Sequence, residues 1–198
     1  MIFILASNNS KKLTEMRQIL SKFDIEVVSQ KEAGLSLDVE ETGTTFAENA
    51  FLKADAAAKA SGHPAIADDS GLCIEALNGE PGIYSARYGG GNLTDSQKYM
   101  LILENMKGKE NRNAKFVSSI ACVFPNGDIL TAEGECKGQI SEKPMGENGF
   151  GYDPIFYIPE LEMSMAELNA DEKNAISHRG KALKLFEMKL KEYINSKG

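Results

Sequence analysis

Residues 64–90 read PAIADDSGLCIEALNGEPGIYSARYGG, and the centre of this stretch is Asp68-Asp69-Ser70-Gly71. The apolar run Ala65-Ile66-Ala67 leads directly into the two carboxylates. This pattern predicts a buried strand that ends in a turn, because Asp, Ser and Gly all favour turns. Catalytic residues often lie at such a strand end, where the strand fixes them and the loop exposes them. Two adjacent carboxylates are costly to bury without a cation, so the stretch indicates either a solvated turn or a metal-binding site.

The composition of the 198-residue chain is that of an ordinary globular protein, with 42 % hydrophobic and 26 % charged residues. The length suits one large domain or two closely packed lobes. The net charge is −7, from 29 acidic and 22 basic residues, which argues against a nucleic-acid partner because such binding needs a basic face. No apolar run approaches about 18 residues, so we expect no membrane span. The three cysteines lack metal-ligand spacing, which favours reduced thiols and a cytoplasmic protein.

The apolar pattern predicts alternating strands and helices followed by a hairpin. The expected strands are at 2–6, 25–28, 65–67, 72–77, 114–124, 129–138 and 155–158. The expected helices are at 10–22, 45–60, 94–107, from 169 and from 177. Thr45 and Glu48 have the spacing of a capping box at the start of the second helix. Strand–helix alternation followed by a long hairpin indicates an α/β fold with a mixed sheet.

A polar segment, Ser7-Asn8-Asn9-Ser10-Lys11-Lys12, joins the first strand to the first helix. Such a junction points backbone N–H groups and the positive end of the helix dipole at the loop, which favours phosphate. Lys11 and Lys12 add positive charge. The Walker A pattern is absent, so a well-capped helix with two solvated lysines is the alternative.

Three other features are ambiguous when taken alone. The segment 149–154, GFGYDP, places two aromatic residues in a glycine-rich loop, where they either fold inward or form a platform for a planar ligand. His178 and Arg179 open the last helix, as exposed polar residues or as ligand contacts. Lys53 lies in an Ala-rich helix, where a lysine usually reaches solvent.

Four segments, taken in order, closely resemble the inosine triphosphate pyrophosphatase family, whose members are also called XTP/dITP diphosphatases. They are SNNSKK (7–12), IADDSG (66–71) with EPGIYSARY (80–88), GFGYDPIF (149–156) and EKNAISHRGKAL (172–183). The resemblance runs from Ile4 to about Leu185. It implies a mixed, twisted sheet with flanking helices, residues 1–198 as one domain with two lobes around a long central cleft, and a homodimer. It also implies Mg²⁺-dependent hydrolysis of the α–β phosphoanhydride of ITP, dITP or XTP, which releases the monophosphate and pyrophosphate.

The resemblance implies a role for individual residues. Asp69 matches a general base that is also a metal ligand, Lys53 matches a catalytic lysine, and Glu41 matches a second metal ligand, a place that Asp38 or Glu40 could take instead. The implied substrate contacts are Ser7, Asn8, Asn9, Ser10, Lys11, Lys12, Ser70, Phe150, Gly151, Tyr152, Asp153, Lys173, His178 and Arg179.

The residue types agree with this chemistry. Mg²⁺ takes few carboxylates and keeps several waters, and with Lys12 and Lys53 it can offset the charge of a triphosphate. No Cys–His or Ser–His pair indicates a covalent nucleophile, so direct attack by water is favoured. Two alternatives remain: a pyrophosphatase of a related fold that acts on pyrimidine or modified nucleotides, and a non-catalytic nucleotide sensor, which would need neither the carboxylates nor Lys53.

Overall fold

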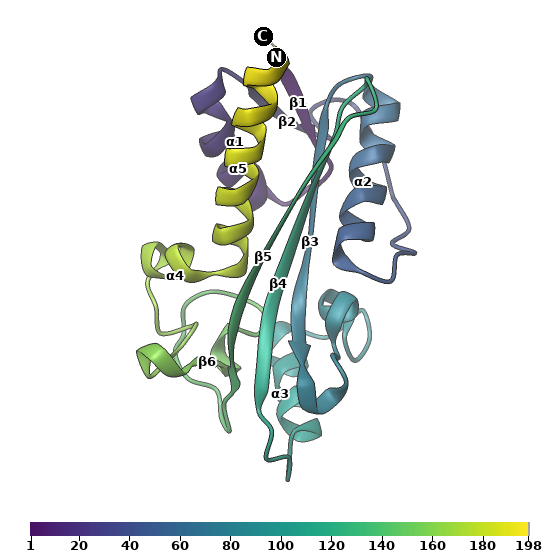
Figure 1. Ribbon diagram of the computed structural model, residues 1–198. Helices are drawn as coiled ribbons and strands as arrows, with labels where there is room; N and C mark the ends of the chain where they lie inside the picture. Colours follow the sequence, from purple (N-terminus) through teal and green to yellow (C-terminus); the bar gives the residue numbers. More distant parts are fainter. Residues whose placement is uncertain (198) are drawn as a thin grey trace. The chain divides into compact units, whose positions relative to one another are not determined.

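The computed structural model describes residues 1–197 (Figure 1), apart from the side chains of Lys11 and Glu15. The strands are β1 (Ile2–Leu5), β2 (Glu26–Ser29), β3 (Ala65–Ile74), β4 (Asn113–Val123), β5 (Ile129–Ile140), β6 (Phe156–Ile158) and β7 (Met163–Ser164). The α-helices are α1 (Ser10–Leu20), α2 (Phe46–Ser61), α3 (Asp95–Asn105), α4 (Ala170–Ile176) and α5 (His178–Lys197). Short 3-10 helices cover Ser21–Phe23, Glu75–Leu77, Gly82–Arg87, Asp153–Ile155 and Pro159–Leu161. None of the helices in residues 1–197 is long and apolar enough to cross a bilayer.

Within the described chain the strands form one seven-stranded sheet, in the order β2-β1-β3-β4-β5-β6-β7. Strand β1 pairs in parallel with β2 and with β3, whereas β6 pairs antiparallel with β5 and β7. The sheet is therefore mixed and has flanking helices, which confirms the predicted α/β class. The predicted capping box is also present, because Thr45 and Glu48 each accept a hydrogen bond from the other's backbone N–H.

The predicted turn at Ser70-Gly71 is wrong. Strand β3 continues through both residues and reaches Ile74. The strand lies between β1 and β4 in the sheet, so the hydrogen bonds of neighbouring strands outweigh the local turn preference of Asp, Ser and Gly. The two carboxylates consequently belong to a strand, and their side chains leave it on opposite faces.

The chain divides into two compact units. Unit 1 consists of Met1–Asp69, Ser118–Gly134 and the chain from Ala182 onward, and unit 2 consists of Ser70–Val117 and Glu135–Lys181. Strands β3, β4 and β5 each continue from one unit into the other.

In unit 1, helices cover both faces of the sheet (Figure 1), and the alternation along β1 shows why. Phe3 and Leu5 pack in a cluster with residues of α1 and α5, including Met16 and Phe186. Ile4 points the other way and packs against the small residues of α2: Ala50, Ala54, Ala57 and Ala58. The small alanine side chains allow this helix to pack closely on the sheet.

The core of unit 2 is a separate cluster. Ile102 of α3, Phe116 of β4 and Phe156 of β6 are buried in it, together with Leu72 and Tyr152. The rings of Phe116 and Phe156 lie 4.5 Å apart between centroids. The cluster includes Tyr152, so it supports the glycine-rich loop of residues 149–154.

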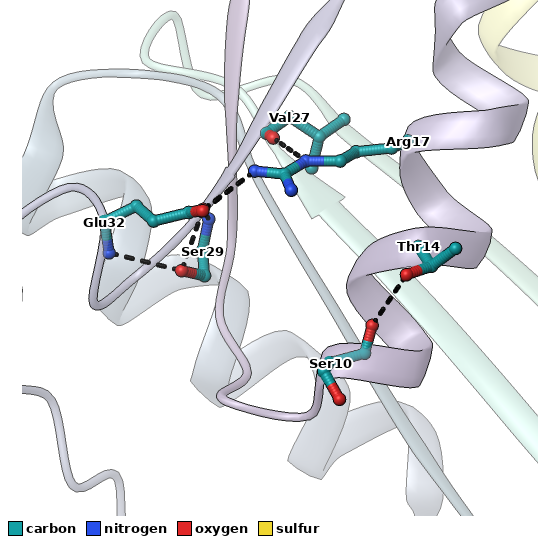
Figure 2. Close-up of polar contacts among 6 residues, drawn as sticks. All are labelled: Ser10, Thr14, Arg17, Val27, Ser29 and Glu32. Atoms are coloured by element: carbon teal, nitrogen blue, oxygen red, sulfur yellow. Dashed lines mark hydrogen bonds and ion pairs between the residues drawn. The ribbon is translucent and has the colours of Figure 1, made fainter.

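Helix α1 is fastened to β2 by Arg17 (Figure 2). The Nε atom of Arg17 donates to the Val27 carbonyl at 2.8 Å, and its guanidinium contacts both carboxylate oxygens of Glu32 at 2.9 and 3.0 Å. The Ser29 N–H also donates to Glu32, at 2.7 Å. Hydrogen bonds from the Ser29 N–H and then from Arg17 hold the pKa of Glu32 below its ordinary value. These contacts tie the helix that begins at Ser10 to its neighbouring strand.

Candidate functional site

The two carboxylates of β3 are divided between two helices of unit 1. Asp68 points to the face covered by α1, and its Oδ2 lies 2.7 Å from the Nζ atom of Lys12. Asp69 points to the opposite face, where α2 supplies Lys53 Nζ at 3.6 Å from Oδ1 and Asn49 Nδ2 at 3.2 Å from Oδ2. Alternation along one strand thus gives each carboxylate its own lysine.

Lys53 lies among acceptors instead of reaching solvent. Its Nζ atom is 2.7 Å from Glu41 Oε1 and donates to the backbone carbonyl of Asp68 at 3.0 Å, in addition to the contact with Asp69. Most of the side chain is buried. The Lys53 ammonium therefore holds the Glu41 carboxylate, in the loop of residues 30–44, close to the Asp69 carboxylate of β3.

The pKa of Asp69 is raised above its ordinary value. Burial is the main cause, and the nearby negative charge of Glu41 adds to it, whereas Lys53 and the hydrogen bond from Asn49 act in the opposite direction. A carboxylate with a raised pKa accepts a proton more readily near neutral pH, as a general base must.

Glu41 and Asp69 have the donor chemistry for Mg²⁺. Burial is the main cause of the raised pKa of Asp69, and the negative charge of Glu41 adds to it. A divalent cation would offset this repulsion. Within the described residues no cluster of three or more His, Cys, Asp or Glu side chains has a metal-holding geometry. Mg²⁺ is commonly held by one or two carboxylates together with substrate phosphates and water, so a pair fits it. Asp38 and Glu40 are exposed, whereas Glu41 is partly buried against Lys53.

The segment between β1 and α1 forms the predicted strand–turn–helix junction. The Asn9 N–H donates to Ser7 Oγ at 3.1 Å, and Asn9 Oδ1 accepts from the N–H of Lys12 at 3.3 Å. Asn8 and Ser10 are exposed. The backbone of Lys11 is in α1, but its side chain lies outside the described part. The Ser7 and Asn9 side chains therefore shape the turn.

In unit 2, Asp153 organises the loop of residues 149–153. Its buried carboxylate accepts from the Phe150 N–H at 2.8 Å and pairs with Lys173 Nζ at 2.5 Å. The Lys173 ammonium also lies 4.6 Å from the centre of the Phe150 ring. Gly149 has a φ of +81°, and a Cβ there would approach Asp153 Oδ2 to 2.2 Å, so the turn needs glycine at this position.

The two aromatic residues of this loop point in different directions. Tyr152 is buried in the unit 2 core and donates its hydroxyl to the Ser85 carbonyl at 2.8 Å. Burial raises the pKa of the Tyr152 phenol, with Tyr88 and Asp95 adding to the effect. Phe150 is 54 % exposed. Tyr152 thus anchors the loop, and Phe150 has a surface available for stacking.

Helices α4 and α5 meet at Ser177. Its hydroxyl accepts from the Gly180 N–H at 3.1 Å. A Cβ at Gly180 would approach the Asn174 carbonyl to 1.9 Å, so this glycine permits the close turn between the helices. The His178 ring stacks on Phe116, with centroids 4.8 Å apart and an interplanar angle of 18°. The imidazole is therefore held in a fixed orientation, and Arg179 beside it is partly buried.

Comparison with known proteins identifies the family. The model of the Ham1 family matches residues 3–189. The chain belongs to the Ham1 family. It is 47 % identical over 196 residues to the dITP/XTP pyrophosphatase of Nostoc sp., covering 98 % of this chain and 97 % of that one. It is 46 % identical to the enzyme of that name from Bacillus anthracis, covering 96 % of each chain. The structure of the Staphylococcus aureus Ham1 protein matches with a TM-score of 0.94 at 44 % identity, covering 98 % of this chain and all of that one.

The candidate residues of this Ham1 chain form two groups. Unit 1 contains the phosphate-loop residues, Glu41, Lys53 and Asp69, and contacts bring the last three together. Unit 2 contains the loop of residues 149–153, Lys173, His178, Arg179 and the partly exposed Ser70. Asn49 was not among the predicted site residues. The one available signal was its position four residues before Lys53, on the same helix face.

Proposed function

We propose that this Ham1 protein hydrolyses the non-standard purine nucleoside triphosphates dITP, XTP and ITP to the monophosphate and pyrophosphate. The names of the Nostoc and Bacillus anthracis relatives support the reaction and the substrate class. The observation that carries the proposal is the Lys53 ammonium between Glu41 and Asp69, at 2.7 and 3.6 Å. A nucleotide sensor would not need a buried acid–lysine cluster of this kind.

The unit 1 residues have complementary roles in the proposed reaction. Asp69, with its raised pKa, accepts a proton from the attacking water. Glu41 and Asp69 hold Mg²⁺, which supplies positive charge to the triphosphate when bound. Lys53 and Lys12 stabilise the negative charge that develops on the phosphates, and the N–H groups at the start of α1 bind phosphate oxygens.

The unit 2 residues serve the base in this proposal. Phe150 stacks on the purine ring, while Asp153 and Lys173 hold the loop that carries it. His178 and Arg179 present donors to the 6-oxo group of hypoxanthine or xanthine. Adenine has an amino donor at that position, so it would leave the donors unpaired, at about 1–3 kcal/mol each.

We further propose that residues 1–198 act as one catalytic domain, that the protein is a cytoplasmic homodimer, and that its partner is the nucleotide and not a nucleic acid or a membrane. The net charge of −7 supports a small-molecule partner over nucleic acid. The homodimer is the assembly that the family resemblance implies.

Pyrophosphate release from a panel of nucleoside triphosphates tests the proposed function. We expect turnover of dITP, XTP and ITP far above that of ATP, because the 6-amino group of adenine would face the donors and leave them unpaired. Pyrimidine triphosphates lack the second ring for stacking on Phe150, so we expect their turnover to be low as well. Turnover should stop in excess chelator and return with Mg²⁺. Preferred cleavage of pyrimidine or modified nucleotides would favour the related pyrophosphatases, and nucleotide binding without turnover would favour a sensor.

Arg179→Ala is expected to lower kcat/KM for ITP more than for ATP, so the preference for ITP over ATP becomes smaller. A loss of about tenfold for ITP corresponds to one hydrogen bond to the base. Lys184→Ala, an exposed change on the same helix, is the control and should leave both values unchanged. An equal loss for the two nucleotides would assign Arg179 to phosphate binding or to structure.

A further inference from the structure

Asn49 lies at the centre of the unit 1 cluster without being one of its charged members. It is completely buried in the first turns of α2. Asn49 and Lys53 are four residues apart, so their side chains share one face of the helix. Each contacts a different oxygen of Asp69: Asn49 Nδ2 is 3.2 Å from Oδ2, and Lys53 Nζ is 3.6 Å from Oδ1. The orientation of the Asp69 carboxylate therefore depends on both residues.

The other end of the Asn49 amide holds the loop of residues 30–44, here called the acidic loop because it carries Asp38, Glu40 and Glu41. Its Oδ1 accepts from the Gly43 N–H at 2.9 Å. Because an N–H can only donate and a carboxylate can only accept, these two partners fix which end of the amide faces Asp69. Gly43 comes two residues after Glu41, so the contact also restrains Glu41, whose Oε1 is 2.7 Å from Lys53.

The loop approaches α2 more closely than any residue with a side chain would allow. A Cβ at Gly43 would lie 2.6 Å from Asn49 Oδ1 and 2.7 Å from Glu48 Cβ. Glu48 adds a second attachment through hydrogen bonds from the Thr44 and Thr45 N–H groups, at 2.6 and 3.2 Å. The acidic loop is thus attached to α2 at two points, and only Asn49 also contacts Asp69 directly.

We propose that Asn49 is a positioning residue, which sets the distance between Glu41 and Asp69 and orients Asp69 by one buried amide. The inference rests on the proposed function, in which these two carboxylates hold the divalent cation. Residues that orient metal ligands by hydrogen bonds typically contribute about 10–100-fold to metal affinity or activity. Asn49 acts on the site through Asp69 and the Gly43 N–H, which its amide contacts.

Asn49→Leu tests the inference, because Leu fills the buried space and removes both hydrogen bonds. We expect a fall in kcat for dITP of about 10–100-fold and a rise of about tenfold in the Mg²⁺ concentration for half-maximal rate. KM for dITP should stay within about threefold, because other residues hold the nucleotide. Without any metal or nucleotide, amide hydrogen exchange at residues 41–43 should become at least about tenfold faster, because the Gly43 hydrogen bond is lost.

Thr45→Ala is the matched control, because it removes the N-cap of the same helix and leaves Asn49, Gly43 and Asp69 in place. It should leave kcat and the Mg²⁺ requirement within about threefold of the wild type. Should Asn49→Leu fail to fold, Gly43→Ala is the second variant, since its Cβ forces the loop away from an intact Asn49. It should raise the Mg²⁺ requirement in the same way.

A folded Asn49→Leu protein that matches Thr45→Ala in kcat, Mg²⁺ requirement and exchange at residues 41–43 would overturn the inference. So would a Gly43→Ala protein with the Mg²⁺ requirement of the wild type. Failure of the proposed function is a different result: the wild type itself would then release no pyrophosphate from dITP. The exchange measurement still decides in that case whether Asn49 holds the acidic loop.

Discussion

Asp69→Asn is expected to lower kcat for dITP by about 10²–10⁴-fold, which is the typical contribution of a general base. The amide keeps the shape of the carboxylate but loses its charge and its basicity. Burial already raises the pKa of Asp69, so removing the charge relieves a desolvation cost, and we expect the folded protein to be retained. The measurement is single-turnover and steady-state pyrophosphate release at saturating Mg²⁺, with circular dichroism to verify folding.

Asp55→Asn is the control for this substitution. Asp55 lies on α2 and pairs with Lys59 at 2.7 Å, away from the Glu41–Lys53–Asp69 cluster, so its loss should leave kcat unchanged. If the Asp69→Asn protein is folded and keeps kcat close to that of the wild type, Asp69 is not the base, and another group must accept the proton.

Lys53→Met is expected to cause a loss of about 10²–10³-fold in kcat, comparable to removing one preorganised donor from an active site. Methionine retains most of the length of the lysine side chain but no charge. The change leaves Glu41 and Asp69 facing each other without the ammonium that now lies 2.7 and 3.6 Å from them. The Mg²⁺ requirement should therefore change together with kcat, which a titration of rate against Mg²⁺ measures.

Lys59→Met, on the exposed side of the same helix, provides the comparison for Lys53→Met and should behave as the wild type. A Lys53→Met protein whose kcat and Mg²⁺ dependence both equal those of Lys59→Met would show that the buried lysine serves stability alone. In that case, the free energy of unfolding of the Lys53→Met protein, measured by urea denaturation, should be lower than that of Lys59→Met.

Most helices and strands were predictable because they depend on local patterns. Apolar runs and the Thr45–Glu48 spacing are read within one segment of chain, and the structure confirms the elements that they predict, except that residues 65–67 and 72–74 form one strand, residues 75–77 form a 3-10 helix and β7 was not predicted. The continuation of β3 through Ser70 and Gly71 was not predictable, since it depends on hydrogen bonds to strands that are distant in sequence.

The same distinction applies to the candidate site. The phosphate loop and Asp69 were predictable because each lies in a recognisable segment, whereas Lys53 lies outside these segments and its role was implied only by the family resemblance. The role of Asn49 arises only when Gly43 and Asp69, from two other segments, are brought to it. Likewise, the sequence does not distinguish the environment of Phe150 from that of Tyr152. In the structure, Tyr152 is buried and its hydroxyl donates to the Ser85 carbonyl.

The division of Asp68 and Asp69 between two helices has a consequence for how this site can change over time. Because the side chains of a strand alternate, adding or deleting one residue ahead of Asp68 would exchange the surroundings of the two carboxylates. The acid beside Lys12 would then face Lys53, and the acid beside Lys53 would face α1. Substitutions in β3 can alter the site gradually, but an insertion or deletion of one residue in this strand would exchange the faces of both carboxylates in a single step.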